Sequence, residues 1–364
     1  MGRREILQHF RNDGYRAELV GQIPVFVISG LLFSISAGIL MQVGLPFPLS
    51  VILHNADLYP KGLGLILIAD AVAALAKHRP ASPLAFLGKR YAEPSFLARL
   101  LARLPLFLVL ALLLPLFAML KPLIPLFQPY TWDATLIAWD RAIFGTDPWI
   151  LLQPVLGYPL ISSILAGFYH GWFLLVYPGS LFILLAPQAD SIRRRYFLAL
   201  VLTWLITGFV LAIAFSSIGP CFLEPILGDR TFASQMAYLH RADGQFPIMV
   251  LDVQQMLLDA YLAQGPGHGA GISAMPSMHV AMAFLFYLAI RHVSHRVAPY
   301  CLAFVLLIWI ASIHLAYHYA LDGAFAIIAT WLIWKLSQAV FVWWDRASAA
   351  LAPSIASRPG TITA

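Results

Sequence analysis

The chain has 364 residues, of which 60% are hydrophobic and only 11% are charged, and its formal net charge is +6. This composition excludes an ordinary soluble globular protein and indicates an all-α, polytopic membrane protein. The positive charge is explained by basic residues at helix ends that face anionic lipid headgroups, so it gives no reason to expect a nucleic-acid partner.

Eight apolar segments follow one another along the chain, and we predict a membrane-spanning helix at each. The second is short and the sixth is marginal for a helix of about 20 residues. In chain order the predicted spans are residues 23–43, 63–75, 104–120, 161–186, 196–218, 276–290, 297–315 and 325–344.

Basic residues set the orientation of these spans. An even number of spans places both chain ends on the same side of the membrane, and all but five of the 23 Lys and Arg fall on that side. We therefore expect an inner (plasma) membrane protein with both termini in the cytoplasm. The five basic residues expected on the outer, periplasmic or lumenal face are Lys61, Lys121, Arg141, Arg230 and Arg241.

Two long segments are expected on the outer face. The first contains a helical pattern over residues 132–141, in which Asp133 and Asp140 are seven apart and share one face. The second contains a helical pattern over residues 247–263 with a polar stripe on an apolar background. We expect both helices to lie flat over the mouth of a catalytic site, with the two carboxylates on a solvated face or on a surface that binds headgroup hydroxyls.

Residues 265–279 combine a glycine-rich loop with a helix start. The loop leads into Pro276-Ser277-Met278-His279 at the head of an apolar run. Proline is tolerated in the first helical turn, and glycines let the backbone approach a ligand closely. Since a helix N-terminus presents unpaired N–H groups and the positive end of the helix dipole, this stretch is suited to an anion such as phosphate.

A second polar cluster lies where the seventh span gives way to the eighth. His318 and Asp322 are four residues apart, so they share a helical face, and His314 lies one turn before them. The predicted topology places His279 and this cluster at the same membrane face. We therefore expect His279, His318 and Asp322 to meet in one site.

These residues also have other interpretations. A histidine in a membrane helix often serves only as a packing donor, although polar residues at membrane depth are costly and tend to be functional. Ser277 is equally suited to cap a helix and to bind phosphate, and His314 is a candidate phosphate-binding residue with a simpler structural role. A metal site remains open, because His279, His314, His318 and Asp322 have plausible ligand spacing.

Two of these motifs resemble signatures of the phosphatidic acid phosphatase type 2 (PAP2) superfamily. Pro276 to His279 matches Pro-Ser-x-His, and His318 to Asp322 matches His-x-x-x-Asp. The resemblance covers residues 104–344 and implies a six-helix core, with the first two spans outside it. Tyr319, the segment from Asp140 to Gly145 and the extra spans look most like the inositol phosphorylceramide synthase branch.

The sequence departs from the family pattern in three ways. The first signature, a Lys six residues before Arg-Pro, is absent, Ser312 stands where an Arg is expected, and Met278 replaces a glycine. The resemblance therefore leaves the counter-charge of the phosphate unassigned. The basic candidates are Arg141, Arg230, Arg241 and, as a fourth, Lys121.

The resemblance implies phosphoryl transfer through a phosphohistidine, with no cofactor and no metal. His318, held by Asp322, would attack phosphorus, while His279 would protonate the leaving oxygen and then deprotonate the acceptor hydroxyl. Ser277 and the N–H groups of residues 275–279 would hold the phosphoryl oxygens. Asp140 is a candidate for the hydroxyls of the head group.

The leading interpretation is a membrane enzyme that moves an inositol-phosphate-like head group from a phospholipid donor to a lipid hydroxyl such as that of ceramide. A lipid phosphatase acting on phosphatidate or a polyprenyl phosphate or diphosphate is the alternative. A metal-dependent hydrolase and a proton-coupled transporter are further alternatives. The expected divisions are residues 1–99 with two extra spans, a catalytic core over 100–346 and a weakly ordered cytoplasmic tail over 347–364.

Overall fold

The computed structural model describes residues 13–45, 49, 52–53, 57–93, 102–186, 189, 191–264 and 271–356. Within these ranges every regular element is helical and no strand occurs. The prediction of an all-α, polytopic membrane protein is confirmed, because six helical stretches are long and apolar enough to cross a membrane. The glycine-rich stretch 265–270 lies outside the described residues.

The six long stretches and two shorter apolar helices correspond to the eight predicted spans. The second is longer than predicted, since Lys77 and His78 complete its last turn, where basic side chains favour a helix C-terminus. The long stretches are Glu18–Gln42 in α2 (Asp13–Gln42), Leu58–His78 (α4), Leu104–Phe127 (α7, Leu104–Leu120; η1, Lys121–Leu123; α8, Ile124–Phe127), Pro159–Leu185 (α11, Pro159–His170; η2, Leu175–Gly179; α12, Ser180–Leu185), Arg193–Ala214 (α13, Arg193–Leu202; η4, Thr203–Val210; α14, Leu211–Ala214) and Ala320–Ala350 in α20 (Ala320–Ala356), and the shorter ones are α18 (Met278–Val293) and α19 (Ala298–His314).

The stretch Arg193–Ala214 forms the centre of the bundle, because it is the most buried of the six. Its first part packs against α2, α18 and α20, and α18 in turn packs against α19 and α20. Helix α2 also packs on α7, and α4 packs on η2 and α12 at the periphery. Helix α20 continues to Ala356, so the first residues of the predicted tail are helical.

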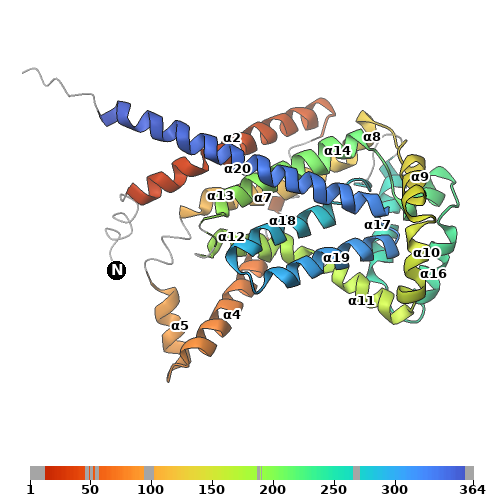
Figure 1. Cartoon of the computed structure of the whole chain (residues 1–364), viewed down its shortest axis with the longest axis horizontal. Helices are drawn as coiled ribbons and strands as arrows, with labels where there is room; N and C mark the ends of the chain where they lie inside the picture. Colours follow the sequence, from red (N-terminus) through yellow and green to blue (C-terminus); the bar gives the residue numbers. More distant parts are fainter. Residues whose placement is uncertain are drawn as a thin grey trace, which may run out of the picture.

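Short helices gather at one end of the bundle. Figure 1 shows α9, α10, α16 and α17 at the end opposite the N-terminus, where α20 also begins. Helix α5 lies at the other end, nearer the N-terminus. The short helices that the structure describes outside the spans are α5 (Pro83–Tyr91), α9 (Asp133–Phe144), α10 (Pro148–Leu156), α15 (Pro220–Phe222), η5 (Leu223–Leu227), α16 (Ala233–Asp243) and α17 (Met249–Gln264).

Two of the spanning stretches contain π-helical turns. These are η2, which includes Pro178, and η4, which is eight residues long. A π-turn widens the helix and is frequent at functional sites. Both segments contribute side chains to the same cavity, which lies between α7, α11, η4 and α18.

Candidate active site

His279 and His318 face one cavity of about 560 Å³. His279 stands in the first turn of α18, and His318 lies in the short connection between α19 and α20. The centroids of the two imidazole rings are 6.4 Å apart. A nucleophile poised for attack lies ~3–3.5 Å from its target atom, and an acid lies ~2.6–3.2 Å from the oxygen that it protonates. A phosphoryl group therefore fits between the two rings.

Asp322 holds the His318 ring from behind. His318 Nδ1 lies 3.1 Å from Asp322 Oδ2, and the Tyr319 N–H donates to the same oxygen, also at 3.1 Å. Asp322 is fully buried, so its carboxylate is fixed by the first turn of α20. A carboxylate can only accept, so Nδ1 carries the hydrogen and the lone pair of Nε2 is free for attack.

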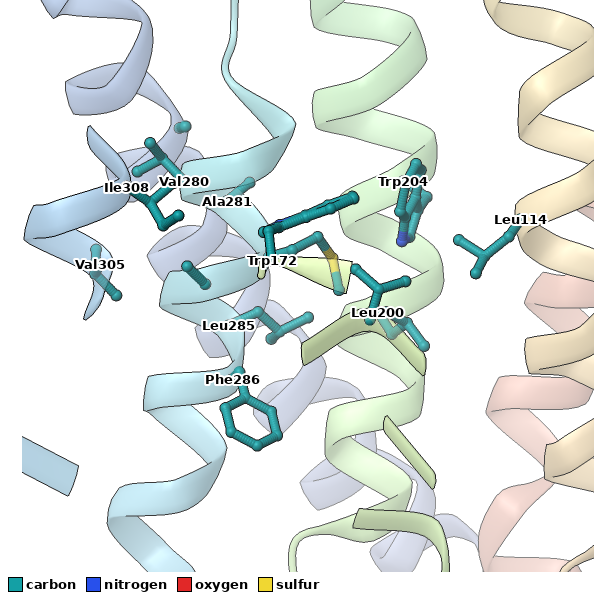
Figure 2. Close-up of a cluster of buried hydrophobic side chains, with 14 of the residues drawn as sticks. Leu114, Trp172, Leu200, Trp204, Val280, Ala281, Leu285, Phe286, Val305 and Ile308 are labelled. Atoms are coloured by element: carbon teal, nitrogen blue, oxygen red, sulfur yellow. The ribbon is translucent and has the colours of Figure 1, made fainter. Parts of the chain in front are cut away.

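Two aromatic side chains enclose the His279 ring. Tyr169 of α11 stacks on it with centroids 4.2 Å apart and an interplanar angle of 17°, and Trp172 lies 4.3 Å away at 37°. Figure 2 shows Trp172 between α18 and the helix that carries Trp204. This packing fixes the ring plane of His279.

Ser277 caps α18 and does not line the cavity. Its hydroxyl accepts from the Val280 N–H at 3.5 Å, and its side chain is fully buried. The Ser277 N–H donates to the Asp322 carbonyl at 3.2 Å, which ties the start of α18 to the start of α20. In the described structure only Met278 and His279 keep N–H groups without an acceptor in this turn, so these two are available to an anion.

Asp140 holds the first turn of α20 from a distant part of the chain. Its Oδ2 accepts from Ala320 N at 2.7 Å, and its Oδ1 accepts from Leu321 N at 3.1 Å. These donors are orphan N–H groups of a helix N-terminus. Burial raises the pKa of Asp140 to about 6, against the effect of the two backbone hydrogen bonds.

Asp133, two turns before Asp140 on the same face of α9, holds two loops. Its carboxylate accepts from Ile218 N and Gly219 N at 3.0–3.1 Å and from the Tyr319 hydroxyl at 2.8 Å. Burial raises its pKa as well. Asp133 and Asp140 are only 3% and 2% exposed, so the interpretation of a solvated face is wrong. The physical reason is that both carboxylates are enclosed by backbone N–H groups that they satisfy.

The loop around Ser217 connects the segments that carry the site. The Ser216 carbonyl accepts from Trp132 N, the Ser217 carbonyl accepts from Ala274 N, and the Ser217 hydroxyl accepts from Met275 N. Gly219 ends this loop with φ +87°, and a Cβ added there would lie 2.5 Å from the Tyr317 carbonyl oxygen. Only glycine fits this close approach.

His314 lies outside the cavity wall. Its Nε2 is 2.8 Å from Ser162 Oγ, which is in turn 2.8 Å from the Tyr238 hydroxyl. Gln235 donates to the carbonyl of His314 at 3.1 Å. This buried network joins α19 to α11 and α16, so the structure places His314 in packing and does not bring it to the imidazoles of His279 and His318.

The three arginines predicted to bind phosphate also lie away from the cavity. Arg141 forms a two-point ion pair with Asp147, with N–O distances of 2.7 and 3.0 Å. Arg230 lies 2.9 Å from Glu224 at a separate hollow. Arg241 is exposed on α16. None of the three is among the residues that line the cavity.

The cavity wall contains Lys121, the fourth of the basic candidates for the phosphate that were predicted from the sequence. It also contains His170, Tyr169 and Trp172, to which the sequence assigned no role in the site. The sequence signal for His170 and Lys121 was their polarity inside apolar segments. Tyr169 and Trp172 had no distinguishing signal, since aromatic residues are common in the spans.

Helix α17 covers part of the mouth, as predicted for residues 247–263. Val253, Met256 and Leu257 line the cavity from its apolar face. The Gln255 side chain donates to Asp259 at 2.8 Å on the exposed face. Helix α9 differs, because its carboxylates face inward and it does not line the cavity.

The four residues whose spacing suits a metal site, His279, His314, His318 and Asp322, do not come together as a ligand set in the part of the chain that the structure describes. His314 is directed to Ser162, and the described residues hold no group of three or more His, Cys, Asp or Glu arranged to hold a metal ion. Cys221 and Cys301 are both free thiols.

Comparison with known proteins gives one match. A family model described as the PAP2 superfamily matches residues 134–336, which include α18, α19 and the first turns of α20. No curated protein and no solved structure matches the chain.

Proposed function

The chain belongs to the PAP2 superfamily, and from this membership and the two imidazoles on one cavity we propose that it transfers a phosphoryl-linked head group between lipids through a phosphohistidine at His318. The observation that carries the proposal is the 6.4 Å separation of the His279 and His318 rings, with Asp322 hydrogen-bonded to the far side of His318. Membership by itself supports a phosphatase or phosphotransferase in general.

In the first half of the reaction, His318 Nε2 attacks phosphorus and forms a P–N bond. The P–O bond to the donor lipid breaks, and His279 gives its proton to the leaving oxygen. Asp322 stabilises the positive charge that develops on the His318 ring. Tyr169 and Trp172 pack on the His279 ring and hold it in place for this proton transfer.

In the second half, the acceptor hydroxyl enters from the side that the leaving group vacated. His279, now neutral, takes the hydroxyl proton, the new P–O bond forms, and the P–N bond breaks. Both imidazoles return to their starting protonation states. General acid–base help of this kind is typically worth ~10²–10⁴-fold.

The rest of the cavity wall suits a lipid. It is mostly apolar, and residues of spanning helices such as Leu114, Phe117, Phe173 and Val176 contribute to it. Its volume of about 560 Å³ lies within the ~300–1,000 Å³ typical of ligand pockets. A head group held between the imidazoles leaves room for acyl chains to extend among α7, α11 and η4.

We further propose that the donor is a phospholipid with an inositol-phosphate-like head group and that the acceptor is a lipid hydroxyl such as that of ceramide. The site would then open to the outer face of the membrane, with both termini in the cytoplasm. The distribution of basic residues supports this orientation. Hydrolysis, with water as the acceptor, uses the same steps and is the alternative.

A labelled-lipid assay distinguishes the two. Purified protein in detergent is given phosphatidylinositol labelled at phosphorus, with and without ceramide. We expect a labelled lipid product that appears only when ceramide is present, and no product from His318→Ala. Free phosphate or inositol phosphate with no new lipid would overturn the transferase proposal in favour of a phosphatase. An unprocessed donor would overturn both.

A further inference from the structure

Several side chains of the cavity wall can donate hydrogen bonds. Beside the two catalytic imidazoles it contains Lys121 and His170, and no Asp or Glu stands among the described residues that line it. The Tyr169 hydroxyl and Trp172 Nε1 belong to the same wall, are buried, and have no hydrogen-bond partner among the described residues. A wall of donors without a carboxylate is complementary to an anion.

Lys121 is the only Lys or Arg among the described residues of this wall. It begins η1, directly after α7, and so approaches the cavity from a different side than α18. Its Cδ would lie 3.9 Å from a Cβ on Gly271, the first described residue after the glycine-rich loop. The side chain therefore runs along the rim between α7 and the chain that leads into His279.

The Lys121 ammonium has no hydrogen-bond or ion-pair partner in the part of the chain that the structure describes. It lines the same cavity as His279 and His318. An unpaired lysine inside a spanning stretch is costly, and such residues mark ligand or ion sites by default. The arginines on the same outer end are paired or exposed away from the cavity, so they leave this role to Lys121.

We propose that the Lys121 ammonium binds the phosphate of the substrate, with the Tyr169 hydroxyl and the Trp172 indole N–H as additional donors. The identity of the substrate as a phospholipid rests on the proposed function. The anion site itself is defined by residues that take no part in the proton transfers. Its ligand class is a phosphate mono- or diester group, and inorganic phosphate and orthovanadate are its simplest probes.

The test measures anion binding apart from turnover. Thermal unfolding of the purified full chain is followed with increasing inorganic phosphate or orthovanadate, for wild type, Lys121→Met and Lys121→Arg. We expect both anions to raise the unfolding temperature of the wild type and of Lys121→Arg. Lys121→Met should bind each anion at least about tenfold more weakly, because a hydrogen bond to a charged group is lost. Lys121→Gln is measured as a second uncharged variant, so that a folding defect caused by methionine alone is not mistaken for lost anion binding.

Two further variants sharpen the result. Tyr169→Phe keeps the ring that stacks on His279 and removes only the hydroxyl, so we expect a smaller, few-fold loss of anion affinity. Arg230→Gln removes an outer cation that lies away from the cavity, and we expect no change. In lipid turnover, Lys121→Met should lower kcat/KM by ~10²–10³, the range for removal of one preorganised donor.

The failure of this inference differs from failure of the proposed function. Anion binding that depends on Lys121 without any lipid processing would overturn the function and keep the site. Lipid turnover with Lys121→Met as active as wild type would overturn the site and keep the function. A wild type that binds neither anion, or anion affinity that falls with Arg230→Gln and not with Lys121→Met, would also refute the role of Lys121.

Discussion

Asp140 offers a test of how the site is held together. It stands outside the cavity and touches neither imidazole, yet it accepts the N–H groups of Ala320 and Leu321 in the turn that carries Asp322. Asp140→Ala leaves one buried and one partly buried N–H group without an acceptor, and an unsatisfied buried donor costs ~1–3 kcal/mol. Because the substitution also removes the cost of burying a carboxylate, we expect a net loss of about 2–4 kcal/mol in the free energy of unfolding.

Asp140→Asn separates charge from shape. The amide keeps one acceptor and removes the buried charge, so we expect the free energy of unfolding to change by less than about 1 kcal/mol. Activity should still fall, because the first turn of α20 is no longer held at two points and Asp322 shifts behind His318. A displacement of about 1 Å costs as much as ~10²-fold in rate. We expect kcat to fall about 10- to 100-fold with KM nearly unchanged, as for a positioning residue.

The assay combines thermal unfolding in detergent with steady-state lipid turnover. Asp147→Asn is the matched control, since in the described structure this nearby carboxylate hydrogen-bonds to Arg141 and not to the first turn of α20. We expect the control to keep its kcat. An Asp140→Asn protein with wild-type kcat, or one whose loss lies entirely in KM, would refute the positioning role.

Three other predictions address the loops, the pH dependence and metals. Gly219→Ala should lower the unfolding temperature, because φ is +87° and the new Cβ would meet the Tyr317 carbonyl oxygen. Gly228→Ala, at φ +72° with open space around it, should lower the unfolding temperature much less. Equal unfolding temperatures for the two variants would contradict the close approach at Gly219. The folded pKa of Asp140, about 6, lies above the ordinary value of 3.8, so its share of stability is present below pH 3.8 and is lost as the pH rises through 6. Unfolding measured across that window should therefore show a steeper fall for wild type than for Asp140→Asn, and parallel curves would count against a raised pKa. Activity should survive EDTA, since the mechanism assigns every step to side chains, and a loss that Zn²⁺ or Mg²⁺ restores would instead favour a metal-dependent hydrolase.

The spans and the central histidines were open to prediction because both depend on local patterns. Apolar runs of sufficient length specify membrane helices without reference to tertiary contacts. His318 and Asp322 are one turn apart, and Pro276 and Ser277 mark the start of α18, so short-range rules place each half of the site. The alternation of spans then brings the halves to one end of the bundle.

The supporting residues depend on contacts across the chain, which local patterns do not report. Asp140 meets Ala320 across 180 positions, and Asp133 meets Ile218 across 85. Their spacing alone indicates two aspartates on the solvated face of a short helix. Their burial depends on the backbone N–H groups that enclose them, which the spacing does not reveal. Tyr169 and Lys121 reach the cavity only through the packing of α11 and α7 around α18.

Covalent labelling of the enzyme tests the central claim most directly. Protein incubated briefly with a phosphorus-labelled donor lipid is quenched in base, and the site of the label is located by mass spectrometry. We predict an acid-labile, base-stable phosphohistidine at His318 that is absent in His318→Ala and is cleared more slowly in His279→Ala. A label on another residue, or donor turnover by a His318→Ala protein at the wild-type rate, would contradict the account.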